Sequence, residues 1–192
     1  MTSTLDLEPG STALIIVDVQ KFTLGHDTHP HTAAAIQANN VRLVAECRKR
    51  GVAVIFVRIA GQAHMGLKTP VDAPFDGFTF TPDWQEFHPD LAPREGETVI
   101  TKHNWGAFYG TDLDPRLRRN GIRTVLITGI ATNFGVESTA RQAQEAAYHC
   151  ILVEDAMGAY SVEDHRFAIE RIFPRLGRVR STDQVIAALE RA

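Results

Sequence analysis

The feature that most constrains the fold of this chain is a regular alternation between continuous apolar segments and segments of helical periodicity. Continuous runs rich in β-branched residues are typical of strands that are buried on both faces of a sheet. The helical segments between them would return the chain for the next parallel strand. We therefore predict an α/β fold with six parallel strands and helices on both faces. The predicted strands cover residues 12–19, 52–59, 98–101, 124–129, 150–155 and 177–181.

Capping signals place helices between these strands. Thr32 is expected to cap the first long helix, and Gly51 is expected to end it. Ser161 is expected to cap a later helix, and the last helix is expected to begin near Asp183. A shorter helix is predicted within "DLDPRLRR", and the basic cluster "RLRRNGIR" is interpreted as its solvated end.

Length and composition favour a single globular domain that spans residues 1–192. No apolar run approaches the roughly 20 residues that a membrane helix needs, and the N-terminal segment lacks the pattern of a targeting peptide. A net charge of −3 does not indicate the basic surface that nucleic-acid binding needs. We therefore expect a cytoplasmic protein with no membrane or nucleic-acid partner. Cys47 and Cys150 are expected to be buried and unpaired.

In open parallel sheets, ligands bind outside the carboxyl ends of the strands, near the point where the strand order reverses. That rule selects three positions in this sequence. Asp18 and Gln20 follow the first predicted strand, and Lys102 follows the third. A turn from Ala131 to Gly135 follows the fourth. We expect these positions to form a small-molecule site.

The turn after the fourth strand reads "GIATNFGVESTA". This string resembles the isochorismatase-like (cysteine hydrolase) superfamily, whose motif is G-x-x-T-x-x-C-V-x-x-T-A. Every marked position matches except the nucleophilic cysteine, where this chain has Gly135. The strings "LIIVDVQ", "VITKHNWGAFYGTDLDPRLRRNGI" and "ILVEDAMGA" extend the resemblance over nearly the whole chain. They place Asp18 and Lys102 at the aspartate and lysine positions of the superfamily.

The resemblance implies a Rossmann-like three-layer sandwich, a small-molecule site at the strand ends and a homo-oligomer. It also implies a cis peptide between Ile130 and Ala131. True isochorismatases of the superfamily also have the glycine, and they cleave a vinyl ether without a covalent intermediate, with the aspartate as acid. Those enzymes usually carry a histidine near the glycine, and this chain departs from them with Asn133 and Phe134.

Asp18, Lys102 and Gly135 are the candidate catalytic residues. Burial would raise the pKa of Asp18, whereas an adjacent Lys102 ammonium would lower it, and the sequence does not rank the two effects. A strand-to-helix corner could require at Gly135 a backbone conformation or a close approach that only glycine allows, and the glycine also leaves space there. Amides at the start of the next helix could then stabilise a developing negative charge. Ser138 is a weak alternative nucleophile, because no base lies near it in sequence.

Candidate substrate-binding residues surround these three positions. Aromatic residues beside them could form the walls of a pocket. Arg58 ends the second strand, where its guanidinium could bind a substrate carboxylate as a fork or pair with Asp72 or Asp76. The full set is Gln20, Arg58, Trp105, Phe108, Ala131, Asn133 and Phe134.

The string "GHDTHPH" offers several metal ligands within a few residues, namely His26, Asp27, His29 and His31. Nicotinamidases of the resembled superfamily bind zinc through an Asp-x-His pattern after the second strand. The corresponding string here, "RIAGQAHMG", contains only His64. We therefore predict no metal and no cofactor, and we interpret the histidines as part of a solvated loop that enters the first helix.

These observations favour a hydrolase that acts on a small, carboxylated molecule by non-covalent acid/base chemistry, such as vinyl-ether hydrolysis with water as the direct nucleophile. A catalytically silent ligand-binding or scaffold protein is an alternative, because buried ion pairs can persist for structural reasons. Amide hydrolysis with another nucleophile is a weaker alternative. A homo-oligomer is expected on a second ground, the aromatic residues between the second and third strands. These are Phe75, Phe78, Phe80 and Trp84.

Overall fold

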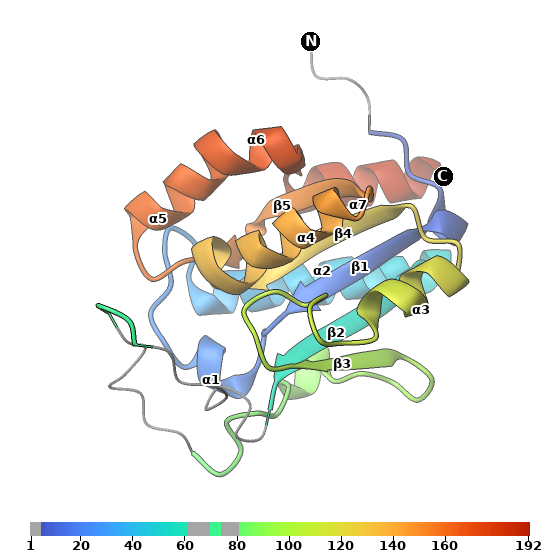
Figure 1. The fold of residues 1–192 in the computed structure, drawn as a ribbon. Helices are drawn as coiled ribbons and strands as arrows, with labels where there is room; N and C mark the ends of the chain where they lie inside the picture. The colour runs from blue at the N-terminus through green and yellow to red at the C-terminus, as the bar shows by residue number, and fades with distance from the viewer. Residues whose placement is uncertain (1–4, 61–69, 74–80) are drawn as a thin grey trace.

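The computed structural model describes residues 5–60, 70–73 and 81–192. They form a six-stranded sheet in which all neighbouring strands run parallel, in the order β3-β2-β1-β4-β5-β6 (Figure 1). The predicted α/β fold with a parallel sheet is therefore confirmed. The strands are β1 (Thr12–Val17), β2 (Ala53–Ile59), β3 (Thr98–Lys102), β4 (Thr124–Ile130), β5 (His149–Gly158) and β6 (Gly177–Arg180).

Strand β1 lies in the middle of the sheet and is buried along its whole length. Ala13, Ile15 and Val17 contribute to one hydrophobic core. Leu14 and Ile16 contribute to a second core on the other face. The alternation follows from the two-residue period of a strand. Because both faces are covered, the strand reads as a continuous apolar run in the sequence.

Helices on both sides of the sheet complete three layers (Figure 1). Helices α2 (Ala33–Arg50) and α7 (Thr182–Arg191) share the core of Leu14 and Ile16. Helices α3 (Leu113–Arg119) and α4 (Glu137–Glu145) share the opposite core. The shorter elements are α1 (Lys21–Leu24), α5 (Val162–Phe167), α6 (Phe173–Leu176), the π-helical turns η4 (Thr132–Val136) and η5 (Ala168–Ile172), and the 3-10 turns η1 (Pro9–Ser11) and η3 (Pro89–Leu91). Across the described ranges, no helix is long and apolar enough to cross a membrane.

The predicted helix boundaries agree with the observed capping. The side chains of Thr32 and Ser161 cap α2 and α5. Gly51 ends α2 with a φ of 70°, a left-handed conformation that glycine adopts without a steric penalty. Helix α7 begins beside the predicted Asp183, and its cap is Ser181.

Two strand ends differ from their predicted positions by two residues or more. Strand β1 ends at Val17 instead of Val19, because Asp18 has a φ of 53° and leaves the extended conformation. Strand β5 runs to Gly158, beyond the predicted end at Asp155. The first difference matters for function, since it turns the Asp18 side chain out of the strand pattern at the edge where ligands bind.

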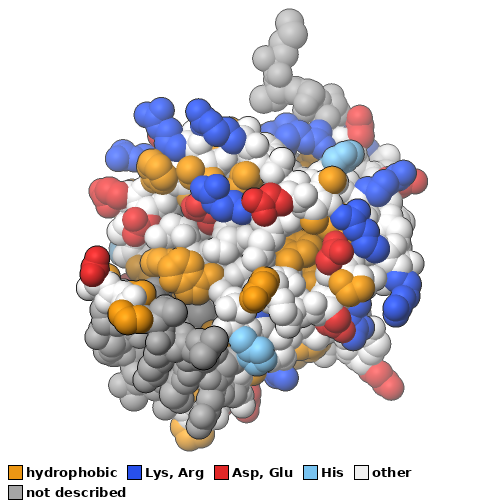
Figure 2. Space-filling model, in the orientation of Figure 1, with side chains coloured by type: hydrophobic (Ala, Val, Ile, Leu, Met, Phe, Trp, Pro, Cys, Tyr) orange, Lys and Arg blue, Asp and Glu red, His pale blue; other side chains and the backbone are white. Residues whose placement is uncertain are grey.

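The basic cluster at the end of α3 is exposed, and acidic neighbours pair with part of it. Arg116 pairs with Asp112 at 2.6 Å, and Arg118 pairs with Asp114 at 3.3 Å. Figure 2 shows Lys and Arg side chains interspersed with Asp and Glu side chains over the visible face. This arrangement agrees with the interpretation of the cluster as a solvated helix end.

Both cysteines are buried and unpaired, as predicted. Cys47 in α2 is 0% exposed and Cys150 in β5 is 3% exposed. They belong to cores on opposite faces of the sheet. Three of the aromatic residues named in the homo-oligomer prediction, Phe75, Phe78 and Phe80, lie outside the described residues.

Candidate active site

A cavity of about 250 Å³ lies at the carboxyl ends of β1, β3 and β4. Strands β1 and β4 are the neighbours at which the strand order reverses, so the cavity occupies the position that the topology predicts. Asp18, Lys102 and Gly135 all line it. The structure therefore brings the three candidate catalytic residues together.

Asp18 and Lys102 form a buried ion pair in the cavity wall. Their residues are 6% and 2% exposed, and Lys102 Nζ lies 2.7 Å from Asp18 Oδ2. Lys102 Nζ also donates to the carbonyl oxygen of Asn104 at 3.1 Å. The other carboxylate oxygen, Asp18 Oδ1, is buried without a hydrogen-bond partner among the described residues. The ammonium thus binds one oxygen of the carboxylate.

Two opposing effects act on the pKa of Asp18, and the effect of burial is the larger one. Burial raises the pKa of Asp18 above its ordinary value, and the attraction of the Lys102 ammonium opposes that shift without cancelling it. A raised pKa leaves a larger protonated fraction near neutral pH than an ordinary aspartate has. The carboxyl of Asp18 is therefore suited to donate a proton.

The backbone around Asp18 fixes the direction of its side chain. The Asp18 amide donates to the Val57 carbonyl at 2.9 Å. The Thr23 hydroxyl donates to the Asp18 carbonyl. A φ of 53° is uncommon for a residue with a side chain, and such conformations concentrate at functional sites. Bonds to β2 and to α1 hold the residue in this conformation.

Gln20 positions the site from outside the cavity, since it is not among the described lining residues. Its Nε2 donates to the carbonyls of Ile59 at 2.9 Å and Gln85 at 2.8 Å. Its Oε1 accepts from the Ile59 amide at 3.0 Å. These bonds join the end of β1 to the end of β2, and they engage the side chain that we expected to bind substrate.

Gly135 lies in the turn after β4, beside the Asp18 side chain. A Cβ at this position would lie 3.2 Å from Asp18 Oδ2, 3.3 Å from Val17 Cγ1 and 3.4 Å from the Trp105 carbonyl oxygen. Gly135 has no positive φ, so the structure supports the close approach and not a conformation that only glycine adopts. Thr139 Oγ1 donates to the Gly135 carbonyl at 2.6 Å and fixes the turn to α4.

The turn itself is the π-helical η4, and the implied cis peptide between Ile130 and Ala131 is present before it. The amides of Phe134 and Val136 donate to the Ala131 carbonyl at 3.1 Å and 3.2 Å. These two amides are engaged within the turn, so the expectation of unpaired amides directed at the cavity is wrong for them. The buried Asn133 Oδ1 has no partner in the described part of the chain.

Three of the candidate substrate-binding residues line the cavity, namely Trp105, Ala131 and Phe134. Besides Gln20, three candidate substrate-binding residues are not among the described lining residues, namely Arg58, Phe108 and Asn133. The alternative nucleophile Ser138 is not among them either. The Phe108 ring packs against a hydrophobic core, 5.9 Å from the ring of Tyr148.

Arg58 makes one side-chain contact to the neighbouring strand among the described residues. Its Nε donates to Thr101 Oγ1 at 3.2 Å across the β2–β3 pair. Within the described residues Asp72 forms no ion pair with Arg58, while Asp76 and His64 lie outside them. The bond to Thr101 directs the guanidinium along the sheet edge.

Aromatic rings make up much of the cavity wall. The rings of Trp105 and Phe134 meet edge to face at 5.0 Å, and those of Phe22 and Trp84 meet at 6.1 Å. Burial, together with the charge of Asp18, raises the pKa of Tyr160 to about 12, so its hydroxyl stays protonated near neutral pH. Sequence reasoning did not select several of the wall residues. These are Phe22, Thr23, Ile59, Trp84, His103, Asn104, Ile130 and Tyr160.

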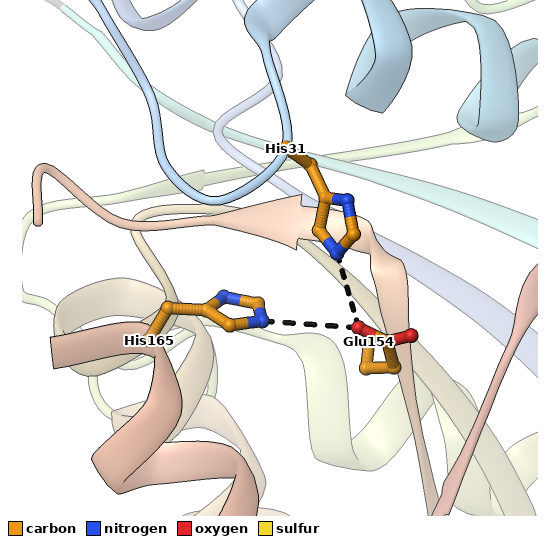
Figure 3. Close-up of side chains that lie close together, drawn as sticks. All are labelled: His31, Glu154 and His165. Atoms are coloured by element: carbon orange, nitrogen blue, oxygen red, sulfur yellow. Dashed lines mark hydrogen bonds and ion pairs between the residues drawn. The ribbon is translucent and has the colours of Figure 1, made fainter. Parts of the chain in front are cut away.

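The histidines of the loop before α2 do not act together. His29 forms a backbone bridge with Ala159, whereas the His31 side chain contacts Glu154 of β5 at 3.0 Å. His165 of α5 approaches the same carboxylate at 3.9 Å (Figure 3). Contacts from His165 and His31 lower the pKa of Glu154. The interpretation of His31 as a merely solvated residue is therefore wrong.

The chain matches a protein-family model and several known proteins. Residues 12–184 match the family model described as "Isochorismatase domain". The chain is 41% identical over 187 residues to the isochorismatase family protein YecD of Escherichia coli O157:H7, covering 96% of this chain and 100% of the relative. It is also 41% identical over 191 residues to YwoC of Bacillus subtilis, covering 97% of this chain and 98% of the relative.

A solved structure of an isochorismatase family protein from Burkholderia thailandensis has the same architecture. It superposes with a TM-score of 0.91 at 40% identity, covering 98% of this chain and 100% of that chain. A family match over most of the chain and full-length relatives lead to the same assignment. The chain belongs to the isochorismatase family.

Proposed function

We propose that this protein is a hydrolase that cleaves an enol ether or vinyl ether in a small molecule by non-covalent acid/base chemistry, with Asp18 as the general acid. The observation that carries the proposal is the buried Asp18 Oδ1, which has no hydrogen-bond partner among the described residues. A carboxyl with a raised pKa and one unengaged oxygen in a cavity wall is equipped to transfer a proton to a bound molecule.

The proposed reaction conserves atoms and charge. The proton of Asp18 adds to the terminal carbon of the C=C bond, and the ether carbon becomes an oxocarbenium-like cation. Water attacks that carbon and returns a proton to the Asp18 carboxylate. The resulting hemiketal then loses the alcohol and leaves a ketone. No covalent bond to the enzyme is required at any step.

Lys102 has a positioning role in this proposal. Its ammonium, 2.7 Å from Asp18 Oδ2, stabilises the carboxylate that remains after proton transfer. Its bond to the Asn104 carbonyl fixes the same group to the loop after β3. The ion pair therefore holds the acid in one orientation.

Gly135 supports the non-covalent route in two ways. The position has no thiol, and the two cysteines of the chain are buried at 0% and 3% exposure in the cores. The 3.2 Å separation between an added Cβ and Asp18 Oδ2 also shows that the acid occupies space next to the corner. The amide-hydrolase alternative lacks a thiol among the described lining residues, whose hydroxyls come from Thr23 and Tyr160.

The cavity wall limits the shape of the proposed substrate. Phe22, Trp84, Trp105 and Phe134 favour a flat, largely apolar molecule. The substrate carboxylate that we expected would have to meet His103 or Lys102, because Arg58 is not among the described lining residues. We propose a small unsaturated ring or chain with at most one anionic group.

Isotope labelling tests this reaction. Candidate enol ethers would be incubated with the enzyme in D₂O, and the products would be analysed by mass spectrometry. Protonation at carbon predicts one solvent deuterium on a carbon atom of the ketone product. A product without carbon-bound deuterium would contradict the proposal, as would turnover confined to amides. Ligand binding without turnover of any candidate would favour a silent binding protein instead.

A further inference from the structure

His31, Glu154 and His165 come from three separate segments and converge at one point (Figure 3). One ligand atom from each lies within 4.8 Å of the other two. Glu154 Oε2 is 3.0 Å from His31 Nε2 and 3.9 Å from His165 Nε2. Ligands about 2.0–2.1 Å from a tetrahedral zinc ion are separated by roughly 3.3 Å. The observed spacings bracket that value.

The loop that carries His31 is held in place before any ion binds. His29 and Ala159 exchange backbone hydrogen bonds of 2.8 Å and 2.9 Å, and the Thr28 hydroxyl donates to the His31 carbonyl at 2.8 Å. A Cβ at Gly158 would lie 3.3 Å from Thr28 Cβ and 3.4 Å from the His31 carbonyl oxygen. The glycine thus permits the close packing that brings His31 to β5.

A neighbouring hydroxyl orients His165. Thr132 Oγ1 lies 2.9 Å from His165 Nδ1, and both residues are buried. This contact leaves Nε2 directed toward Glu154 (Figure 3). Histidines that bind metals commonly have the other ring nitrogen engaged in this way, which fixes the ring orientation.

We propose that His31, Glu154 and His165 bind a divalent transition-metal ion, with Zn²⁺ as the best fit, at a site separate from the cavity of Asp18. Two imidazoles and one carboxylate are a ligand set that proteins use for zinc, with water in the fourth position. The side chains of His31 and Glu154 are 28% and 34% exposed, so an ion and its water can enter. None of the three residues is among the described lining of the cavity.

The ion would join the loop before α2, strand β5 and helix α5. It would also support the active-site turn, because Thr132, which contacts His165, begins the π-helical turn that contains Gly135. The three residues are therefore positioning residues and not catalytic ones. This proposal departs from our prediction of no metal, which considered ligands that are close in sequence.

Zinc binding to the untagged protein tests the proposal. The protein would be depleted with a chelator and titrated with Zn²⁺ by calorimetry. The visible spectrum of the Co²⁺ form would report the coordination. We expect one equivalent of Zn²⁺ per chain and the absorption of four-coordinate Co²⁺. The Zn²⁺ complex of the wild type should also unfold at a higher temperature than the depleted protein.

Variants assign the binding to these ligands. His31→Gln and Glu154→Gln should abolish one-to-one binding, and Thr132→Val should weaken it by about 10–100-fold, the usual effect of removing an outer-shell partner. His149→Gln, at an exposed histidine that begins β5, is the matched control and should bind like the wild type. Circular dichroism would verify that each variant is folded, and His31→Gln alters only a half-buried loop residue.

Two results would overturn the proposal. The first is the absence of stoichiometric Zn²⁺ binding to the depleted wild type. The second is one-to-one binding that survives in folded His31→Gln and Glu154→Gln. Neither measurement depends on the reaction proposed for Asp18, so the two proposals can fail separately.

Discussion

Asp18 Oδ2 lies directly against Gly135, at a distance where a Cβ on residue 135 would approach the oxygen to 3.2 Å. In the superfamily motif that this chain resembles, the same position carries the nucleophilic thiol. Here a side chain at position 135 would meet Asp18 Oδ2, Val17 Cγ1 and the Trp105 carbonyl oxygen. The corner without a side chain is therefore part of the arrangement of Asp18 and not merely the loss of a cysteine.

Gly135→Ala should disturb this contact. The added methyl group would press on Asp18 Oδ2, on Val17 Cγ1 and on the Trp105 carbonyl, so we expect a loss of about 1–3 kcal/mol in the free energy of unfolding and a lower rate. Urea denaturation and turnover would measure both. Gly10→Ala is the control, because a Cβ there meets nothing within 4 Å, and its effect should stay within about 0.5 kcal/mol. Equal effects of the two substitutions would contradict the explanation that close contacts at position 135 require a glycine.

Lys102→Met should make stability depend more strongly on pH. Because burial already raises the pKa of Asp18, removing the ammonium that opposes this shift should raise it further. The folded state then binds a proton that the unfolded state releases near its ordinary pKa. Stability is therefore retained at low pH and lost as pH rises toward the folded-state pKa.

Urea denaturation at about pH 5 and pH 8 would measure this dependence. An uncompensated carboxylate at the higher pH should cost about 3–5 kcal/mol, and the loss should be smaller at the lower pH. The alkaline limit of activity should also move to higher pH in any active Lys102→Met preparation. A Lys102→Met variant that is more stable at pH 8 than at pH 5 would contradict the predicted direction of this pH dependence.

Cys47→Ala and Cys150→Ala should leave the rate nearly unchanged. Burial raises the pKa of Cys47 to about 12 and that of Cys150 to about 11, so neither forms a useful thiolate near neutral pH. Each substitution should cost about 1 kcal/mol of stability. Thiol alkylation of the folded enzyme should be slow and should not inhibit it. Rapid inhibition by alkylation, relieved in either alanine variant, would assign a thiol to the reaction.

Light scattering should give the mass of a homo-oligomer, which is at least twice the 21.2 kDa of one chain. The expectation rests on the aromatic residues between β2 and β3 and on large exposed rings elsewhere. Trp105 and Tyr109 in the loop after β3 are 58% and 70% exposed, which is unusual for neighbouring aromatic residues on an isolated monomer. A mass near 21.2 kDa at micromolar concentration would exclude the homo-oligomer.

The parts of this molecule that could be predicted from its sequence depend on local pattern. Strand β1 reads as a strand because it is buried on both faces. Asp18 and Lys102 stand at strand ends that the parallel topology brings together, so their meeting follows from the order of the strands. Gly135 could be placed at the corner for the same reason.

The remaining features depend on contacts that leave no local pattern. Tyr160 reaches the cavity only because β5 lies beside β4. His31 meets Glu154 across 123 positions of sequence, so spacing among the loop histidines pointed to the wrong partners. Gln20 was selected as a ligand-binding residue, but backbone groups of β2 and the following segment engage its side chain. Three-dimensional placement alone distinguishes these roles.

The central claim is that the Asp18 carboxyl supplies the proton for a non-covalent hydrolysis. Asp18→Asn should lower the rate by about a hundredfold or more, the usual scale for loss of a general acid. The double variant Asp18→Asn/Lys102→Met removes both charges, so it separates loss of the acid from the effect of an unpaired buried ammonium. The most direct measurement is the turnover of a confirmed substrate by these folded variants, together with mass spectrometry of the enzyme during wild-type turnover. We expect both variants to lose activity and the wild type to carry no adduct. Full activity in folded Asp18→Asn, or a covalent adduct on the wild-type chain, would contradict the claim.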